Sequence, residues 1–234
     1  MLEAYVRRIG IYDADLDHEV FYEGRLSAYP GLERQVLVET TPFEGAGLWV
    51  DEIEHAGNQS SSSEEVDEVD RIVDSLLHPA ARWIDSHGTA RPLTANDVLV
   101  VTPYNAQVAL LEERLGSKGV RVGTVDRFQG QEAPVVIYAM TTSVPEDAPH
   151  GMEFLYSLNR LNVATSRARW ACILVASPAC SHPTVKPPGK CNLPMRFAAM
   201  SNLLRPWLGP EGFGEAIGAS VFGKSVGYSP GTAP

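Results

Sequence analysis

The chain of 234 residues lacks long hydrophobic runs, and no stretch approaches the ~18 apolar residues of a membrane-spanning helix. Its N-terminus is charged early and lacks the apolar core of a signal peptide. Cysteine is scarce. Cys172, Cys180 and Cys191 are an odd number without repeated spacing, which is typical of a reducing compartment. We therefore expect a soluble, cytoplasmic protein.

The chain also lacks an excess of positive charge. It has 19 Lys and Arg against 29 Asp and Glu, a formal net charge of -10. This balance argues against a protein that binds nucleic acid through its overall charge, but a local basic groove needs only a few well-placed groups. We expect a lead-in at residues 1–20, one domain at 21–208 and a disordered tail rich in Gly, Pro and Ser at 209–234.

Short continuous apolar segments alternate with helical patterns along the chain. Ser62–Glu65 has the residues of a capping box, and apolar residues recur at helical spacing behind it. A second helix is expected over 106–118, with Gly119 as its stop. The alternation predicts an α/β domain with a mostly parallel sheet and helices on both faces. Strands are expected at 36–38, 47–50, 98–101, 134–140 and 171–176.

Two polar segments are not explained by packing. Val122–Glu132 (VGTVDRFQGQE) forms a tight polar turn directly before an apolar strand. Leu158–Arg169 (LNRLNVATSRAR) is expected to be a helix that carries three arginines. Guanidinium groups match the oxygens of phosphate, so polar groups at a strand end beside such a helix indicate a phosphate-handling site.

These two segments resemble motifs V and VI of the superfamily 1 helicases, in the branch of the nonsense-decay helicase and the eukaryotic replication helicase–nuclease. Val101–Gln107 (VTPYNAQ) resembles the TPY..Q segment of the same C-terminal motor domain, and Phe21–Leu26 the stretch after its YRMHP-type motif. Gln129–Pro134 and the tail at Cys191–Trp207 are most similar to the helicase part of bacterial RecB-like nuclease–helicase fusions. The resemblance implies a RecA-like domain of the P-loop NTPase type that lacks its own phosphate loop.

The resemblance implies that Arg167 is the arginine finger, which contacts the γ-phosphate of ATP and stabilises the transition state. Arg160 lies two helical turns earlier on the same expected face, as a bridge to the polar turn or as a structural ion pair. Arg169 is expected to face solvent. We expect Arg167 to point away from the core at the carboxyl edge of the sheet.

The polar turn provides the other nucleotide-side candidates. Gly130 allows a close backbone approach or a positive φ, and Glu132 lies near the ribose or phosphate in the family pattern. A carboxylate at Glu132 could equally pair with Arg160. Gln129 and Asp126 are expected to couple the nucleotide site to the nucleic acid.

Two threonines follow strands and are the candidates for nucleic-acid contact. The resemblance implies that Thr102 and Thr124 hold phosphates of a single strand, helped by Tyr104 and Gln107. Alternatively, Thr102 caps the next helix, because Pro103 follows it, and the tyrosine ring packs.

Two segments imitate ATPase motifs. Gly218–Ser225 fits GxxxxGK[ST], but no strand pattern precedes it and only nine residues follow, too few for the required helix. Leu48–Glu52 imitates a Walker B strand, and we interpret it as a strand that ends in two acids. The phosphate loop and the magnesium-binding acid must then come from an N-terminal helicase domain, in cis or in trans.

We interpret the chain as the second motor domain of an ATP-dependent DNA or RNA helicase, a truncated or separately encoded piece. Its expected partners are single-stranded DNA or RNA and the N-terminal domain, with ATP and Mg²⁺ shared between the domains. The alternative is a non-catalytic binding or regulatory module that retains the fold.

Overall fold

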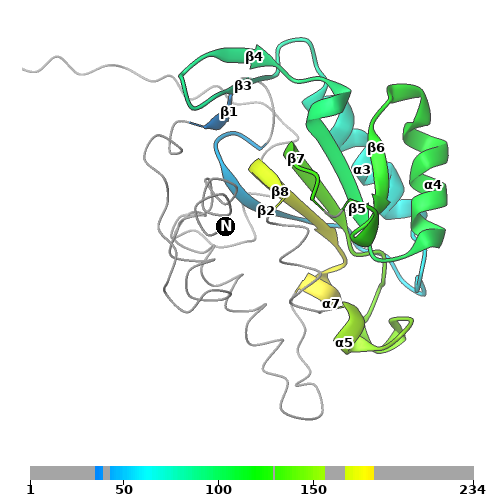
Figure 1. Ribbon diagram of the computed structural model, residues 1–234. Helices are drawn as coiled ribbons and strands as arrows, with labels where there is room; N and C mark the ends of the chain where they lie inside the picture. The colour runs from blue at the N-terminus through cyan, green and yellow to red at the C-terminus, as the bar shows by residue number, and fades with distance from the viewer. Residues whose placement is uncertain (1–34, 39–42, 129, 156–166, 182–234) are drawn as a thin grey trace, which may run out of the picture.

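A parallel sheet of five strands organises the chain. The computed structural model describes residues 35–38, 43–128, 130–155 and 167–181. The strand order is β2-β8-β7-β5-β6, and every neighbouring pair is parallel (Figure 1). All residues of β5 and β7 are buried, as expected for strands covered on both sides. The strands are β2 (Gly47–Glu52), β5 (Val98–Thr102), β6 (Arg121–Thr124), β7 (Ala133–Ala139) and β8 (Ala168–Ala176).

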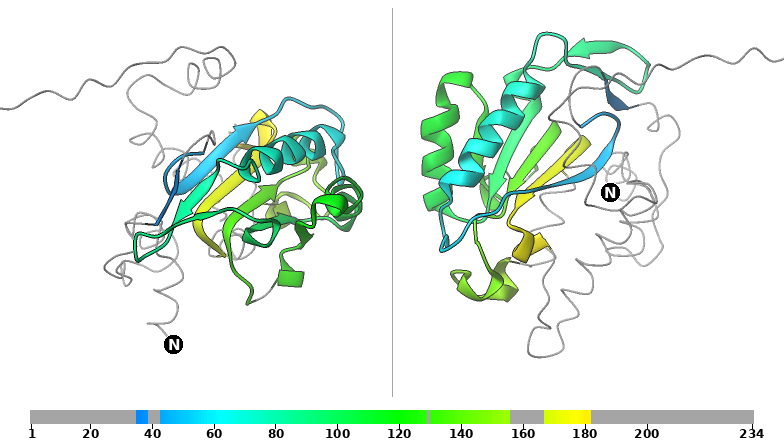
Figure 2. Two further views of the ribbon diagram at one scale, coloured as in Figure 1. Left: turned by 90° about the horizontal axis from the view of Figure 1, so that it is seen from above. Right: turned by 180° about the vertical axis from the view of Figure 1, so that it is seen from behind.

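Two helices pack side by side on one face of this sheet (Figure 2, right). Helix α3 (Ser63–Leu76) buries the apolar residues expected from its spacing, and α4 (Asn105–Leu115) does the same. A 3₁₀ turn, η3 (Gly116–Lys118), extends α4 before Gly119 stops it with a left-handed φ of 73°. The predicted RecA-like α/β fold class is confirmed.

The start of α3 is fixed to α4 by an unexpected cap. Ser62 Oγ accepts the N–H of Glu65 at 3.1 Å, which confirms half of the predicted capping box. The Glu65 carboxylate turns into the interior instead of reaching back. Gln107 replaces it, because its Oε1 accepts the N–H of Ser62 at 2.8 Å and its Nε2 donates to the Ser62 carbonyl at 3.1 Å.

The connection between β6 and β7 crosses from one edge of the sheet to the other. It occupies residues 125–132 and contains a 3₁₀ turn, η4 (Asp126–Phe128). It lies directly against β6, since a Cβ on Gly123 would come within 2.7 Å of Arg127 Cδ and 2.8 Å of the Phe128 ring. The polar segment noted in the sequence therefore touches both edges of the sheet.

A small antiparallel sheet lies at the amino ends of the parallel strands (Figure 1). Its strands are β1 (Val36–Val38), β3 (Arg82–Ile84) and β4 (Ala90–Pro92), of which only β1 was predicted. Trp170 of β8 anchors it by donating from Nε1 to the Ile84 carbonyl at 3.0 Å. The remaining short elements are η2 (Ala95–Asp97), η5 (Pro145–Asp147), α5 (Met152–Leu155) and α7 (Pro178–Ser181).

The prediction of a helix over 158–169 is wrong for the last two residues. Strand β8 begins at Ala168, which pairs with Ala133 of β7, so Arg169 belongs to a strand. The sheet ladder overrides the local helical spacing there. Residues 1–34, which include the lead-in, and 182–234, which include the tail and Gly218–Ser225, lie outside the described residues. No helix in the described part of the chain is long and apolar enough to cross a membrane.

Candidate functional site

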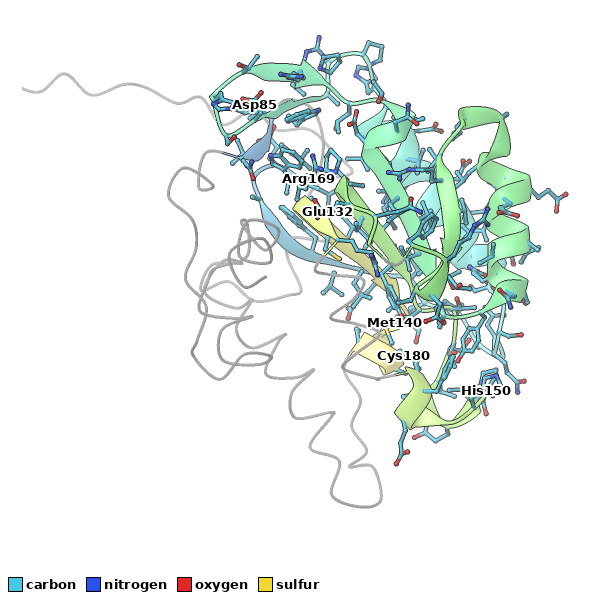
Figure 3. All side chains as sticks on the ribbon, in the orientation of Figure 1. Asp85, Glu132, Met140, His150, Arg169 and Cys180 are labelled. Carbon is cyan, nitrogen blue, oxygen red and sulfur yellow. The ribbon has the colours of Figure 1, made fainter. Side chains whose placement is uncertain are left out.

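The candidate residues divide between the two edges of the parallel sheet. In Figure 3, Glu132 and Arg169 lie at one end of the strands, and Met140 and Cys180 lie at the other. The first end is the amino edge, where β7 and β8 begin, and the second is the carboxyl edge. The two candidate threonines end β5 and β6 and therefore lie at the carboxyl edge.

Arg167 lies at the amino edge. Its Nη1 donates to the carbonyl of Gln131 at 3.2 Å, and its own carbonyl accepts the N–H of Ala133 at 3.0 Å. The residue is only 6% exposed. The expectation that Arg167 lies at the carboxyl edge and points outward is wrong, because it immediately precedes β8. It contacts Gln131 of the polar turn, a role that the sequence had suggested for Arg160.

Glu132 pairs with the arginine that was expected to face solvent. Arg169 Nε donates to Glu132 Oε2 at 3.2 Å, with side-chain exposures of 51% for Arg169 and 18% for Glu132. Arg169 is exposed, as expected, and its guanidinium in addition forms an ion pair with this carboxylate. Arg160, the alternative partner, lies outside the described residues.

A further arginine, overlooked in the sequence, reaches the same turn. Arg121 begins β6, and its Nη1 donates to Gln131 Oε1 at 3.1 Å while its Nη2 donates to the carbonyl of Asn96 at 3.0 Å. Guanidinium groups from β6 and β8 thus bind neighbouring residues of the turn, Gln131 and Glu132. Arg121 could have been noticed in the sequence because it begins a strand. That position indicates a place at the amino edge only once the strand is known to be parallel to its neighbours.

Gly130 provides the bend that brings the turn to this edge. Its φ is 83°, a left-handed conformation that favours glycine, and nothing lies within 4 Å of where a Cβ would stand. Backbone conformation, not space, is therefore the requirement at this position. The N–H of Gln131 donates to the carbonyl of Phe128 at 3.0 Å and closes the turn. Gln129 lies outside the described residues.

The carboxyl edge carries a cluster of hydroxyl groups. Thr102 is fully buried, and its Oγ1 lies 3.2 Å from that of Thr141, so the two share a hydrogen bond. The hydroxyl of Thr142 donates to Tyr104 Oη at 3.4 Å. Thr102 does not cap the following helix, since Tyr104 is the N-cap of α4 and receives no side-chain cap bond.

The other candidates near this edge differ in exposure. Thr124 is half-buried at the end of β6, in register with Thr102, and Asp126 is exposed in η4. Gln107 is fully buried and occupied with the cap of Ser62. Nucleic-acid contact by these residues stays a prediction.

A buried carboxylate organises the carboxyl edge. Glu65 Oε2 accepts the N–H of Thr141 at 2.8 Å, and Glu65 Oε1 lies 3.1 Å from His55 Nε2. His55 Nδ1 in turn lies 2.7 Å from Ser143 Oγ. Burial raises the pKa of Glu65, whereas its hydrogen bonds from His55 and Thr141 lower it. Thr141 has a φ of 75°, a strained conformation for a β-branched residue, so the surrounding network must hold it there.

The acids that end β2 have local partners. Asp51 lies 3.6 Å from Arg71 Nη2, and Glu52 accepts a hydrogen bond from Ser181 Oγ. Burial, followed by a hydrogen bond with Glu68, raises the pKa of Asp51 to about 7. Within the described ranges, no group of three or more His, Cys, Asp or Glu side chains could hold a metal ion.

Asp51→Asn is expected to stabilise the protein at alkaline pH. The folded-state pKa of Asp51, about 7, lies above the ordinary value of 3.8. The protein is therefore most stable below pH 3.8, where Asp51 is neutral in both states, and loses stability as the pH rises toward 7. We expect the variant to gain roughly 2 kcal/mol in unfolding free energy at pH 8 and almost nothing at pH 4. Urea unfolding at both pH values measures this; an equal gain at each pH would contradict it.

Comparisons with known proteins agree with this fold. A family model described as an AAA domain matches residues 14–179. DNA polymerase alpha-associated DNA helicase A of Schizosaccharomyces pombe is 31% identical over 166 residues, 67% of this chain and 25% of the relative. The putative helicase MOV-10 of Gallus gallus is 27% identical over 188 residues, 69% of this chain and 19% of the relative.

The DNA-binding protein SMUBP-2 of Rattus norvegicus is 29% identical over 167 residues, 64% of this chain and 15% of the relative. The chain spans a quarter or less of the length of these relatives. The family match, in contrast, covers well over half of the chain. The chain therefore belongs to this AAA-domain family and carries an ATP-dependent-helicase-type domain of superfamily 1.

Proposed function

We propose that this chain is the second motor domain of an ATP-dependent helicase and presents arginines to a triphosphate held by an N-terminal motor domain. The observation that carries the proposal is that Arg121, Arg167 and Arg169 each donate a hydrogen bond to residue 131 or 132. Guanidinium groups are permanently charged and match phosphate oxygens. An acidic chain that gathers three of them at one sheet edge has a surface suited to a nucleotide.

In this proposal, the nucleotide faces the amino edge of β7 and β8. Arg167 acts as the arginine finger, and its Gln131 carbonyl partner gives way to a γ-phosphate oxygen. Gly130 lets the backbone approach the nucleotide, while Glu132 lies beside the ribose or phosphate. Arg160 acts as a second arginine there. ATP is bound with Mg²⁺, and the phosphate loop and metal ligands belong to the other domain.

The carboxyl edge is proposed to contact single-stranded DNA or RNA. Thr124 is the proposed direct contact, because its side chain is partly exposed. The fully buried Thr102 and Gln107 and the buried Tyr104 would act mainly by shaping this edge. The connection at residues 125–132, which includes Asp126 and Gln129, joins the two edges. It would couple the state of the nucleotide to the affinity for single-stranded nucleic acid.

ATPase assays of the chain alone and of the chain joined to a phosphate-loop motor domain test this function. We expect no measurable turnover from the isolated chain and turnover stimulated by single-stranded nucleic acid from the joined motor. The joined motor should also bind single strands with a clear salt dependence. Robust turnover by the isolated chain, abolished by Lys224→Ala, would instead assign the phosphate loop to Gly218–Ser225 and overturn the proposal.

A non-catalytic binding module is the second candidate, and the net charge of -10 favours it. Such a module would keep the fold while binding a protein partner. Filter binding with single-stranded DNA at low and high salt separates the two functions. A motor domain should bind weakly with an affinity that falls as salt rises, whereas a protein-binding module should retain no DNA at either concentration.

A further inference from the structure

Arg169 and Glu132 form a partly buried ion pair at the amino edge. Ala168 and Ala133 are partners in the parallel β7–β8 ladder, so Arg169 and Glu132 lie diagonally across it, on either side of that pair, and their long side chains span the gap. Figure 3 shows both side chains at this end of the strands. The bond from Arg169 Nε to Glu132 Oε2 is 3.2 Å long, and the carboxylate is the more buried partner, at 18% exposed.

We infer that Arg169 is a positioning residue for the nucleotide site, acting through Glu132 on ATP binding and not on the hydrolysis step. This inference rests on the proposed function, which places Glu132 beside the nucleotide. A carboxylate there would repel a triphosphate unless its charge is compensated. The guanidinium of Arg169 supplies that compensation and holds the carboxylate in one orientation, in which it can accept a hydrogen bond from a ribose hydroxyl.

The pair predicts an unusual pattern in double variants. Arg169→Gln removes the positive charge of Arg169 from the Glu132 carboxylate, which then repels the triphosphate more strongly. Adding Glu132→Gln removes that repulsion, so the double variant should bind ATP better than Arg169→Gln alone. A pair that served only the stability of the fold would show this rescue in the unfolding midpoint, so a rescue of KM between variants with equal midpoints is what assigns the pair to the nucleotide site.

The test measures steady-state ATP hydrolysis by the motor that joins this chain to a phosphate-loop domain. We expect Arg169→Gln to raise KM for ATP about tenfold with kcat changed less than about threefold, and Arg169→Lys to give an intermediate KM. The double variant should recover at least half of the loss in KM. Arg114→Gln is the matched control, since Arg114 is 47% exposed and forms its ion pair with Asp67 on α3, not with residues 131–132.

Thermal unfolding midpoints of all variants are measured in parallel, and Arg169→Lys serves if Arg169→Gln does not fold. An unchanged KM in an active motor, a loss confined to kcat, or a double variant weaker than Arg169→Gln would each overturn the inference and leave the proposed function intact. A wild-type joined motor without ATPase activity would instead remove the proposed function, and this inference with it.

Discussion

Arg167→Ala is expected to lower the kcat for ATP by about 10³-fold or more in the motor that joins this chain to a phosphate-loop domain. An arginine finger stabilises charge that develops on the transferring phosphoryl group, and its removal costs about 10³–10⁵ in rate. Because that stabilisation arises in the transition state, KM for ATP should change far less than kcat. Single-turnover measurements at saturating ATP isolate the chemical step.

Arg167→Lys sharpens this test. Lysine keeps the positive charge but lacks the planar fork, so we expect it to recover only a small part of the lost rate. Since Arg167 also holds the Gln131 carbonyl, unfolding by urea must show that each variant still folds cooperatively. Arg114→Ala, which removes a surface arginine of α4, should leave kcat unchanged. A folded Arg167→Ala motor with the wild-type kcat would exclude Arg167 as the finger.

Glu65→Ala is expected to cause a large loss of stability, about 3–4 kcal/mol in unfolding free energy. Glu65 is fully buried, and its carboxylate accepts the N–H of Thr141 while contacting His55. Alanine leaves both partners buried without an acceptor and removes the contact that holds Thr141 in its left-handed conformation. Urea unfolding followed by circular dichroism measures the loss.

Two variants show whether the loss has this cause. Glu65→Gln keeps an oxygen that can accept the N–H of Thr141, so it should lose about half as much stability as Glu65→Ala. Glu64→Ala removes the neighbouring carboxylate, which is exposed and bonded to Asn58 and Ser62, and should lose less than about 1 kcal/mol. Equal losses for Glu64→Ala and Glu65→Ala would show that capping of α3, and not the buried network, is the important interaction.

Periodicity and capping residues predicted the covering helices well. Val66, Val69 and Ile72 are buried in α3 as their spacing requires, and Gly119 stops the segment after α4 in the left-handed conformation. These features depend on interactions within a few residues, which local patterns record. The parallel sheet was predictable for a related reason, because strands buried on both sides need continuous apolar segments.

The partners of the polar residues were not predictable from local patterns. Gln107 was expected to assist nucleic-acid binding, yet it completes the cap of a helix 45 positions away in sequence. Arg169 was expected in a helix facing solvent, yet pairing of β8 with β7 places it in a strand beside Glu132. Contacts between side chains that are distant in sequence depend on the order of the strands in the sheet. The pattern of a single segment does not predict that order.

The sequence by itself determined the α/β class, the helices that cover one face, and the two polar segments that carry the resemblance to helicase motifs. Only the tertiary structure decided that Arg167 and Glu132 both lie at the amino edge while Thr102 and Thr124 lie at the carboxyl edge. The physical reason is that hydrophobic periodicity reports burial along one segment. Which ends of different segments meet depends on how the strands pair, and that is a property of the whole sheet.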